Sequence, residues 1–511
     1  MEPLRLSLSD CVRLGVNGNL SVLRKQLERD EKKFDIEVSR KIFVPEASLA
    51  VKDFVDRYKN VTIDQAITKT FSDGSKGGVR TSTSDDWNLP TRNSRTHGVF
   101  LTRPLLRNFG RHIAGYGVEL NIIDYDLAIE TFISDLNDFI YKTGTTYFDL
   151  AFARKNLEIT QQACLRAKRQ FDDTKNDIEL GTIAEQEIYL VEENLVEFEI
   201  RRENAKHEIA RLELELKKAM NIDPAVETPL AVSLPVLSSS ISTRMASAAS
   251  IASIASIASD APVFPVSLNT PLTLNASLTS DAPLASAPSL ARAPDSDSAG
   301  VSPPETGIPE AFFEAATFSS AVDAMLANNP DFRMKELSLK RSQTDLAWQK
   351  NQYLPQLDLN AEYKWREGRD FSQRDFFALG VQYDIPLTRN SDRALVNKFR
   401  MNEQIQRLSK QDAQLVLTYE LKRIFLDIEH LEHILKARSR VVELSRKKLD
   451  AETEKYKNGF TTLADIVRFQ RELEDSLLEE LSTSVSLNKL RMNRLLIEGT
   501  LYKAFEIAIG S

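Results

Sequence analysis

The sequence predicts a mainly α-helical protein in which long antiparallel coiled-coil helices are combined with β-hairpins. Glycine and proline are absent from 387–458, and they are absent again from 460–498, beyond the lone Gly459. Stretches of this length without a helix breaker indicate two long helices that meet at one turn. Two other segments, 356–365 and 377–385, alternate between apolar and polar residues, which is typical of strands with one apolar face.

The composition argues against several classes of function. The 511 residues hold 66 lysines and arginines against 74 aspartates and glutamates, with no basic cluster, which argues against nucleic-acid binding. The five histidines are scattered, and Cys11 and Cys164 lie far apart, so we expect neither a metal site nor a disulfide framework. The two cysteines are expected to pack on helices. No nucleophile with its base is visible, so we predict no enzyme and no cofactor.

The sequence also bears on membrane insertion and export. No run of about 18 apolar residues occurs, so we expect no transmembrane helix. The first residues, MEPLRLSLSD, lack a basic region followed by an apolar core, so no signal peptide is visible. Taken alone, these observations favour the cytoplasm.

The order of motifs indicates an internal duplication. Asn19 and Pro45 match Asn329 and Pro355 at one offset of 310 residues (329 − 19 and 355 − 45). Between the halves, twelve of the 19 prolines fall in 224–309, which we interpret as a low-complexity linker, with a small packed element as the alternative. We therefore divide the chain into a first repeat at 1–222, a linker or insertion at 223–316, a second repeat at 317–500 and a C-terminal tail at 501–511.

Each half is expected to carry a long outgoing helix and a returning helix. On the second outgoing helix, apolar residues recur every seven positions, which is a coiled-coil pattern: Leu421, Ile428, Leu435, Val442 and Leu449. About 65 helical residues span roughly 100 Å, which is too long for a globular domain. We expect outgoing helices over about 112–178 and 388–457, returning helices over 182–222 and about 461–498, and turns at Gly181 and Gly459.

The strands are expected as one hairpin in each half. In the second half, one face of the hairpin is apolar and the other is polar or small: Leu357, Leu359, Ala361, Tyr363, Trp365, Phe377, Leu379, Val381, Tyr383 and Ile385 lie on the apolar face. The first half offers a weaker pair near 46–56 and 97–104, with Asp53 on its apolar face. A polar stretch of about 40 residues without a clear pattern separates this pair. We therefore expect four strands per chain.

Such hairpins suit either a water-soluble sheet over a core or a membrane β-barrel with lipid outside. Tyr363, Trp365 and Tyr383 favour the membrane, because Trp and Tyr gather at its interfaces. Lipid offers no partner for the edge of an open sheet, and closed barrels begin at about eight strands, so several chains would have to pool their strands. The lipid face of the barrel would consist of Leu357, Leu359, Tyr363, Trp365, Phe377, Leu379, Val381 and Tyr383.

This order of motifs resembles the outer membrane efflux protein family, the TolC-like channels of tripartite efflux pumps and type I secretion systems. The motifs are NGN and NNP at helix starts, VP and LP before the strands, RPLLRNFGR and IPLTRN after them, and LGTIAEQEIYLVE and NGFTTLADIVRFQ at the turns. They cover nearly all of 6–222 and 317–498. The resemblance implies a homotrimer that pools four strands per chain into a 12-stranded outer membrane barrel, above an α-barrel tunnel through the periplasm.

The resemblance implies an exit duct for efflux or secretion, located in the outer membrane and extending into the periplasm. Its implied partners are a periplasmic adaptor (membrane fusion) protein and, indirectly, an inner membrane pump. The residues leave one alternative open, a cytosolic elongated coiled-coil scaffold. The missing signal peptide favours the scaffold, whereas two apolar-faced hairpins favour the channel.

The resemblance also assigns residues to the tunnel entrance. Glu187 and Asp465, six residues after the tip glycines, correspond to acidic residues at the constriction, and Tyr456 corresponds to a tyrosine that helps to close it. Arg468 stands where well-known members carry a second acidic residue, so a doubled anionic ring is not expected. The alternative for Glu187 and Asp465 is a plain helix-terminal role, favourable near the positive end of the dipole.

The turns between outgoing and returning helices are, by the same resemblance, candidates for docking the adaptor hairpin. The residues concerned are Gly181, Thr182, Gly459, Phe460 and Thr461. Plain turn chemistry is the alternative for each of them.

Overall fold

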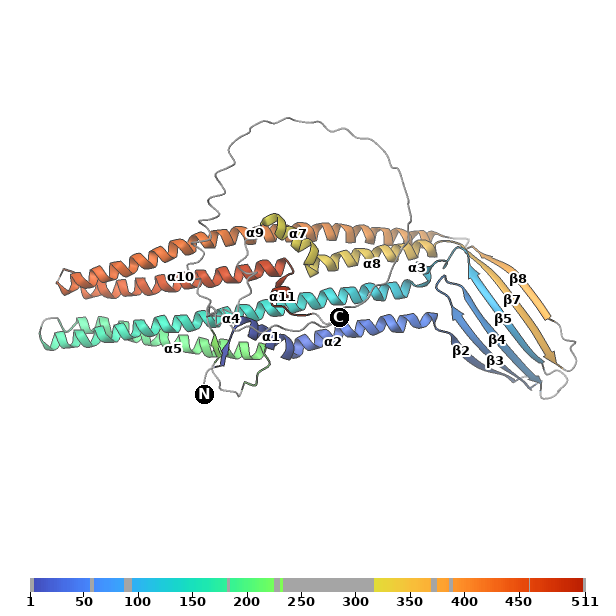
Figure 1. Ribbon diagram of the computed structural model, residues 1–511, viewed down its shortest axis with the longest axis horizontal. Coiled ribbons are helices and arrows are strands. Elements are labelled where there is room, and N and C mark those ends of the chain that lie inside the picture. The colour runs from blue at the N-terminus through green and yellow to red at the C-terminus, as the bar shows by residue number, and fades with distance from the viewer. Residues whose placement is uncertain are drawn as a thin grey trace, which may run out of the picture. The chain divides into compact units, whose positions relative to one another are not determined.

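Figure 1 shows the protein as a computed structural model. The structure describes residues 4–55, 59–86, 94–181, 184–224, 230–232, 317–368, 375–385, 389–458 and 460–508. Most of the predicted linker at 223–316 lies outside the described residues.

The two halves build a similar series of elements. The first half contains β1 (Leu4–Leu6), α1 (Leu8–Gly18), α2 (Leu20–Arg40), the 3₁₀ turn η1 (Lys41–Phe43), β2 (Glu46–Val55), β3 (Lys59–Thr70), β4 (Lys76–Asp86), β5 (Ser94–Pro104), α3 (Arg111–Ala114), α4 (Tyr116–Glu179) and α5 (Glu187–Ala219). After β6 (Leu230–Val232), the second half contains α7 (Phe318–Asn328), α8 (Pro330–Gln352), β7 (Gln356–Gly368), β8 (Asp375–Asp384), α9 (Asn390–Lys457), α10 (Leu463–Ile497) and α11 (Leu501–Ala504).

A matched asparagine joins the first two helices of each half. The side chain of Asn19 accepts a hydrogen bond from a backbone N–H in the first turn of α2, and that of Asn329 does so in the first turn of α8, both at 2.9 Å. The same two amides donate to the carbonyl oxygens of Ala219 (3.0 Å) and Ile497 (2.8 Å), at the ends of α5 and α10. Each half is therefore closed on itself by one asparagine.

The expected long helices lie within a few residues of their predicted bounds. α4 contacts α2, α8 and α10 besides its own partner α5, whereas α9 contacts α7 and α8 before it pairs with α10. Successive parts of the seven-residue pattern on α9 therefore face different helices. Leu421 is buried in a cluster with residues of α7 and α8, and further along the helix Lys448 forms an ion pair with Glu472 of α10 at 2.8 Å.

The sheet contains six antiparallel strands in the order β2-β3-β4-β5-β7-β8, so the prediction of four strands is wrong. The second-half hairpin, β7 with β8, is confirmed. β3 and β4 fill the polar stretch in which no pattern was visible, so β2 and β5 are not neighbours. The pattern was hidden because Gln65 interrupts the apolar alternation of β3, and because Val79 is the sole large apolar residue of β4.

All four connections between the sheet and the helices lie at the same end of the strands, beside the β3–β4 turn. This turn is tied to the connection that follows β5, because the N–H of Gly110 donates to the carbonyl of Asp73 at 3.1 Å. Gly74 has a φ of +89°, and a Cβ there would lie 2.2 Å from the carbonyl oxygen of Asn108. Glycine is therefore required at this close approach.

Three residues of the predicted linker have a defined partner, since β6 pairs in parallel with β1. Cys11 and Cys164 are both buried, as expected. Among the described residues, no helix is both long enough and apolar enough to cross a membrane.

Candidate functional site at the helix tips and the sheet face

The two helical hairpins end in short turns that expose apolar side chains. α4 gives way to α5 through Gly181, whose φ of +71° is the left-handed cap conformation that favours glycine. Beside it the side chain of Leu180 is 76% exposed, and in the second turn that of Phe460 is 82% exposed. Thr182 and Gly459 lie outside the described residues.

A small apolar core lies directly beneath the two turns. Val191 of α5 and Leu463 and Val467 of α10 are buried in it, and Tyr456 of α9 packs against them. Phe171 of α4 and Ile188 of α5 complete the cluster. The structure therefore joins the two tips, and it places the ring of Tyr456 against the core that they share.

Asp465 lies in the first turn of α10, whose N-cap is Thr462. Its carboxylate accepts hydrogen bonds from the hydroxyls of Thr462 (2.7 Å) and Thr461 (3.2 Å), and its backbone N–H donates to Thr462 Oγ1. Arg468 pairs with the same carboxylate at 2.9 Å and also lies over the ring of Phe469. The Thr462 hydroxyl, more than any other neighbour, lowers the pKa of Asp465 below its ordinary value. Asp465 is thus ionised, hydrogen-bonded and partly neutralised.

Glu187 is the first residue of α5, and Ile188 beside it enters the shared core. This position is favourable for a carboxylate, because the N-terminal end of a helix carries a partial positive charge. The helix-terminal interpretation of Glu187 and Asp465 therefore describes their local structure. It is compatible with a position at an entrance, since both lie in the first turn of the helix that follows its tip.

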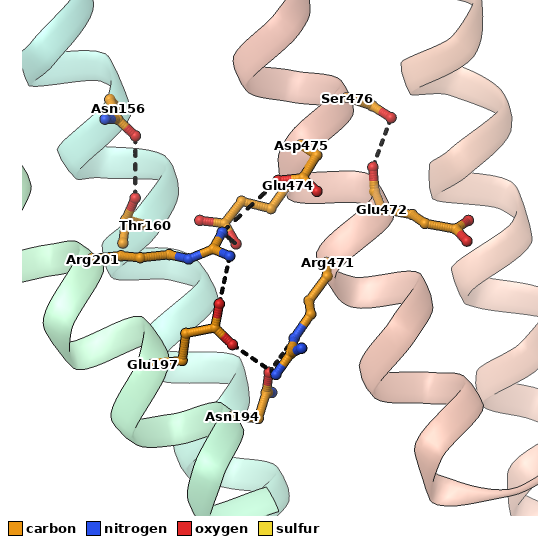
Figure 2. A network of polar contacts seen from close by, with 10 residues as sticks. All are labelled: Asn156, Thr160, Asn194, Glu197, Arg201, Arg471, Glu472, Glu474, Asp475 and Ser476. Carbon is orange, nitrogen blue, oxygen red and sulfur yellow. Dashed lines mark hydrogen bonds and ion pairs between the residues drawn. The ribbon is translucent and has the colours of Figure 1, made fainter. Parts of the chain in front are cut away.

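A polar network farther along the hairpins, which no sequence pattern indicated, links α5 to α10 (Figure 2). The guanidinium of Arg201 pairs with Glu197 at 2.7 Å, and Arg471 of α10 pairs with the same carboxylate at 2.8 Å. Arg471 also donates to the Asn194 side chain at 3.0 Å. Charged groups thus connect the hairpin of the first half to that of the second.

Glu474 is the buried member of this network. Its side chain is fully buried and lies 3.5 Å from the guanidinium of Arg201, yet neither carboxylate oxygen accepts a hydrogen bond within the described parts of the chain. Burial raises the pKa of Glu474 to about 7, although Arg201 opposes the shift. Burial likewise lowers the pKa of the nearby Arg166. A pocket of about 410 Å³ adjoins Glu474 and Arg201.

One face of the sheet is apolar and open across all six strands. Among the side chains of this face that the structure describes, no large one is buried, and the following are exposed: Leu49, Val51, Ile67, Val79, Val99, Leu101, Tyr363, Phe377, Leu379, Val381 and Tyr383. Leu357, Leu359 and Trp365 lie on this face by register and are intermediate in exposure. The eight residues predicted for a lipid face therefore share one face of the sheet.

The helices nearest the sheet form a row, α2–α4–α8–α9, whose two outer members carry exposed apolar stripes. On α2 the stripe contains Leu20, Leu27 and Phe34, which are seven residues apart. On α9 a second stripe contains Met401, Leu408 and Leu415 with the same spacing, followed by Tyr419 and Leu426. Both stripes are coiled-coil seams without a partner within the described residues.

Residues 321–489 match the family model described as outer membrane efflux protein. This segment is similar to the outer membrane efflux protein family. A search of curated proteins finds no match. Nothing in these comparisons supports the alternative of a cytosolic coiled-coil scaffold.

Solved structures extend the likeness in fold from the efflux protein segment to nearly the whole chain. The CmeC outer membrane channel of Campylobacter jejuni has a TM-score of 0.60 and 12% identity, over 97% of this chain and 86% of that one. The VceC outer membrane protein of Vibrio cholerae has 0.61 and 10%, over 96% of each chain. The open MtrE outer membrane channel of Neisseria gonorrhoeae has 0.59 and 12%, over 97% of this chain and 89% of that one.

Proposed function

We propose that this protein is the outer membrane channel of an efflux or secretion system, and that it conducts its cargo through the periplasm and the outer membrane. The observation that carries the proposal is the open apolar face of the sheet. A contiguous apolar surface of this size is unfavourable in water and marks contact with lipid or protein. The opposite face is polar, as expected for a surface that lines a water-filled lumen.

The channel requires a closed ring of chains, and three copies are proposed. β2 and β8 are the edge strands of the sheet, and lipid cannot satisfy their free N–H and C=O groups. The outer helices α2 and α9 are attached to these same strands and carry the unpaired seams. Pairing β8 of one copy with β2 of the next would satisfy the free backbone groups, and packing α9 against α2 would bury the exposed seams. A head-to-tail contact of this kind generates a ring.

The tunnel entrance is proposed at the helix tips, with Glu187, Asp465, Tyr456 and Arg468 around it. Three-fold symmetry would bring like carboxylates together, and such rings favour cations. Because Arg468 neutralises part of the Asp465 charge, the preference is expected to be weak. The turns with Gly181, Thr182, Gly459, Phe460 and Thr461 are proposed to dock a periplasmic adaptor, and an inner membrane transporter would supply the energy. The duct itself is proposed to perform no chemical reaction.

Fractionation of the source cells tests the proposal. The native protein is expected in the outer membrane fraction, and its mass after extraction in mild detergent is expected to be that of a trimer of the 57.7 kDa chain. Reconstituted into a planar bilayer, the purified oligomer should form discrete ion-conducting pores. A soluble monomer or dimer in the cytoplasm would contradict the proposal.

A further inference from the structure

The hairpin formed by β3 and β4 is built like the rest of the sheet. β3 has 12 residues and β4 has 11, against 10 in each of the edge strands β2 and β8. A tilted strand of about 9–11 residues crosses the apolar part of a membrane. The added strands are therefore long enough to belong to the membrane wall.

The register places the apolar residues of the hairpin on the same face as those of the neighbouring strands β2 and β5. A single row of directly paired residues crosses the whole sheet, and every member of it is apolar: Ala47, Ile67, Val79, Val99, Tyr363 and Phe377. Ile67 and Val79 give β3 and β4, the second and third strands of the order, side chains as exposed as those of their neighbours.

The opposite face of the hairpin is polar and is joined to its neighbours. Lys52 of β2 pairs with Asp64 of β3 at 3.2 Å. The row beside this pair reads Ser48, Ala66, Arg80, Gly98 and Lys364, which are small or charged, and it ends at Phe376 of β8. The two strands thus share both the apolar and the polar surface of the sheet, as strands of a barrel wall do.

The turn of the hairpin is anchored where the strands meet the helices. Besides the hydrogen bond from Gly110 to Asp73, the backbone at Gly74 packs against Asn108. The amide of Asn108 in turn accepts a hydrogen bond from Gln352, at the end of α8, at 2.7 Å. The hairpin is therefore held at the same level as the other strand ends.

We propose that each copy contributes six strands to the membrane wall, so that a ring of three copies closes an 18-stranded barrel (6 × 3) in place of the 12 strands (4 × 3) that four per chain would give. This inference rests on the proposed function. The diameter of a barrel grows roughly in proportion to its strand number. The outer membrane pore would be about one and a half times as wide as that of a 12-stranded barrel, and about twice as large in cross-section. It would therefore pass bulkier cargo.

Spin labels at single cysteines test whether the hairpin lies in the wall. The buried Cys11 and Cys164 are first replaced by alanine. Labels are then introduced by Ile67→Cys and Thr68→Cys in β3, and by Val381→Cys and Gln382→Cys in β8 as the reference pair. In the reconstituted oligomer, Ile67→Cys and Val381→Cys are expected to collide with oxygen dissolved in the lipid. Thr68→Cys and Gln382→Cys are expected to collide with a water-soluble nickel chelate.

The reference pair separates this inference from the function on which it rests. If Val381→Cys contacts lipid while Ile67→Cys contacts water, the hairpin is outside the wall and the 18-stranded barrel is wrong, although the channel remains. If Val381→Cys also contacts water, the membrane channel itself is wrong. Should the labels in β3 prevent folding, electron microscopy of the unlabelled oligomer counts the strands, and a ring of 12 would overturn the inference.

Discussion

At the residue scale, Glu474 is a carboxyl group held between two helical hairpins with no exposed surface. Its pKa of about 7 in the folded protein lies above its ordinary value of 4.5. The folded state therefore binds a proton more tightly than the unfolded state does. This contribution to stability is fully present below about pH 4.5, and it is lost as the pH rises through about 7.

We predict that the thermal unfolding midpoint of the purified protein falls between pH 5 and pH 8, and that Glu474→Gln flattens this dependence. The whole shift corresponds to on the order of 3 kcal/mol. The neutral amide removes the buried charge and keeps nearly the same shape. Glu193→Gln on the exposed side of α5 is the matched control and should leave the pH profile unchanged. An unchanged profile in Glu474→Gln would show that other groups dominate it.

Arg468 offers a second prediction, because it neutralises the carboxylate of Asp465 at the proposed entrance. Replacing it by Ala should leave each Asp465 charge uncompensated, and the cation-to-anion permeability ratio of the reconstituted pore should rise, on the order of a few-fold. Arg423→Ala removes the same charge from an exposed position on another helix, α9, and should change the ratio little. Equal effects of the two variants would place Asp465 away from the ion path.

At the scale of elements, the backbone that follows α10 packs closely against the end of α7. Gly499 has a φ of +68°, and its backbone passes so close to Asn328 that a Cβ would lie 2.3 Å from that carbonyl oxygen. We predict that Gly499→Ala lowers the free energy of unfolding by about 2 kcal/mol or more, through strain and a displaced helix end. Chemical denaturation in detergent measures the change.

Gly117→Ala is the control for this prediction. A Cβ at Gly117 meets nothing within 4 Å, and the residue lies within α4. Alanine is the better helix former, so this variant should be neutral or more stable, by up to about 1 kcal/mol. If the two variants behaved alike, the close contact between α10 and α7 would have no energetic weight.

The elements differ in how far the sequence predicts them. The long helices, the turn at Gly181 and β7–β8 follow from local patterns, because breakers, heptads and strict alternation act over neighbouring residues. β3 and β4 were missed because their alternation depends on Thr81, Thr83 and Gln65, which suit a half-exposed strand but carry no apolar signal. Glu474 was missed although Val467, one heptad before it, marks its position as apolar. Its burial depends on α4 and α5, which are distant in sequence.

At the scale of the whole molecule, the two unpaired seams on α2 and α9 should decide whether chains assemble. We predict that Leu408→Lys combined with Leu415→Lys on α9 converts the proposed trimer to monomers, because two charges would be buried without partners in the contact between copies. Native mass spectrometry in detergent reads the outcome. Gln414→Lys, which adds a charge beside the same stripe, should leave the trimer intact. A trimer in the double variant would place the contact elsewhere.

The matched asparagines have a consequence for the order in which this chain folds. Asn19 reaches Ala219, and Asn329 reaches Ile497, so the contact that completes each half needs no residue from the other half. A chain that reaches its folding compartment N-terminus first can therefore complete the first hydrogen-bonded closure before the second half arrives. Segments that close within themselves generally fold as units. The folded first half would then present α4 as the surface against which α8 and α10 pack.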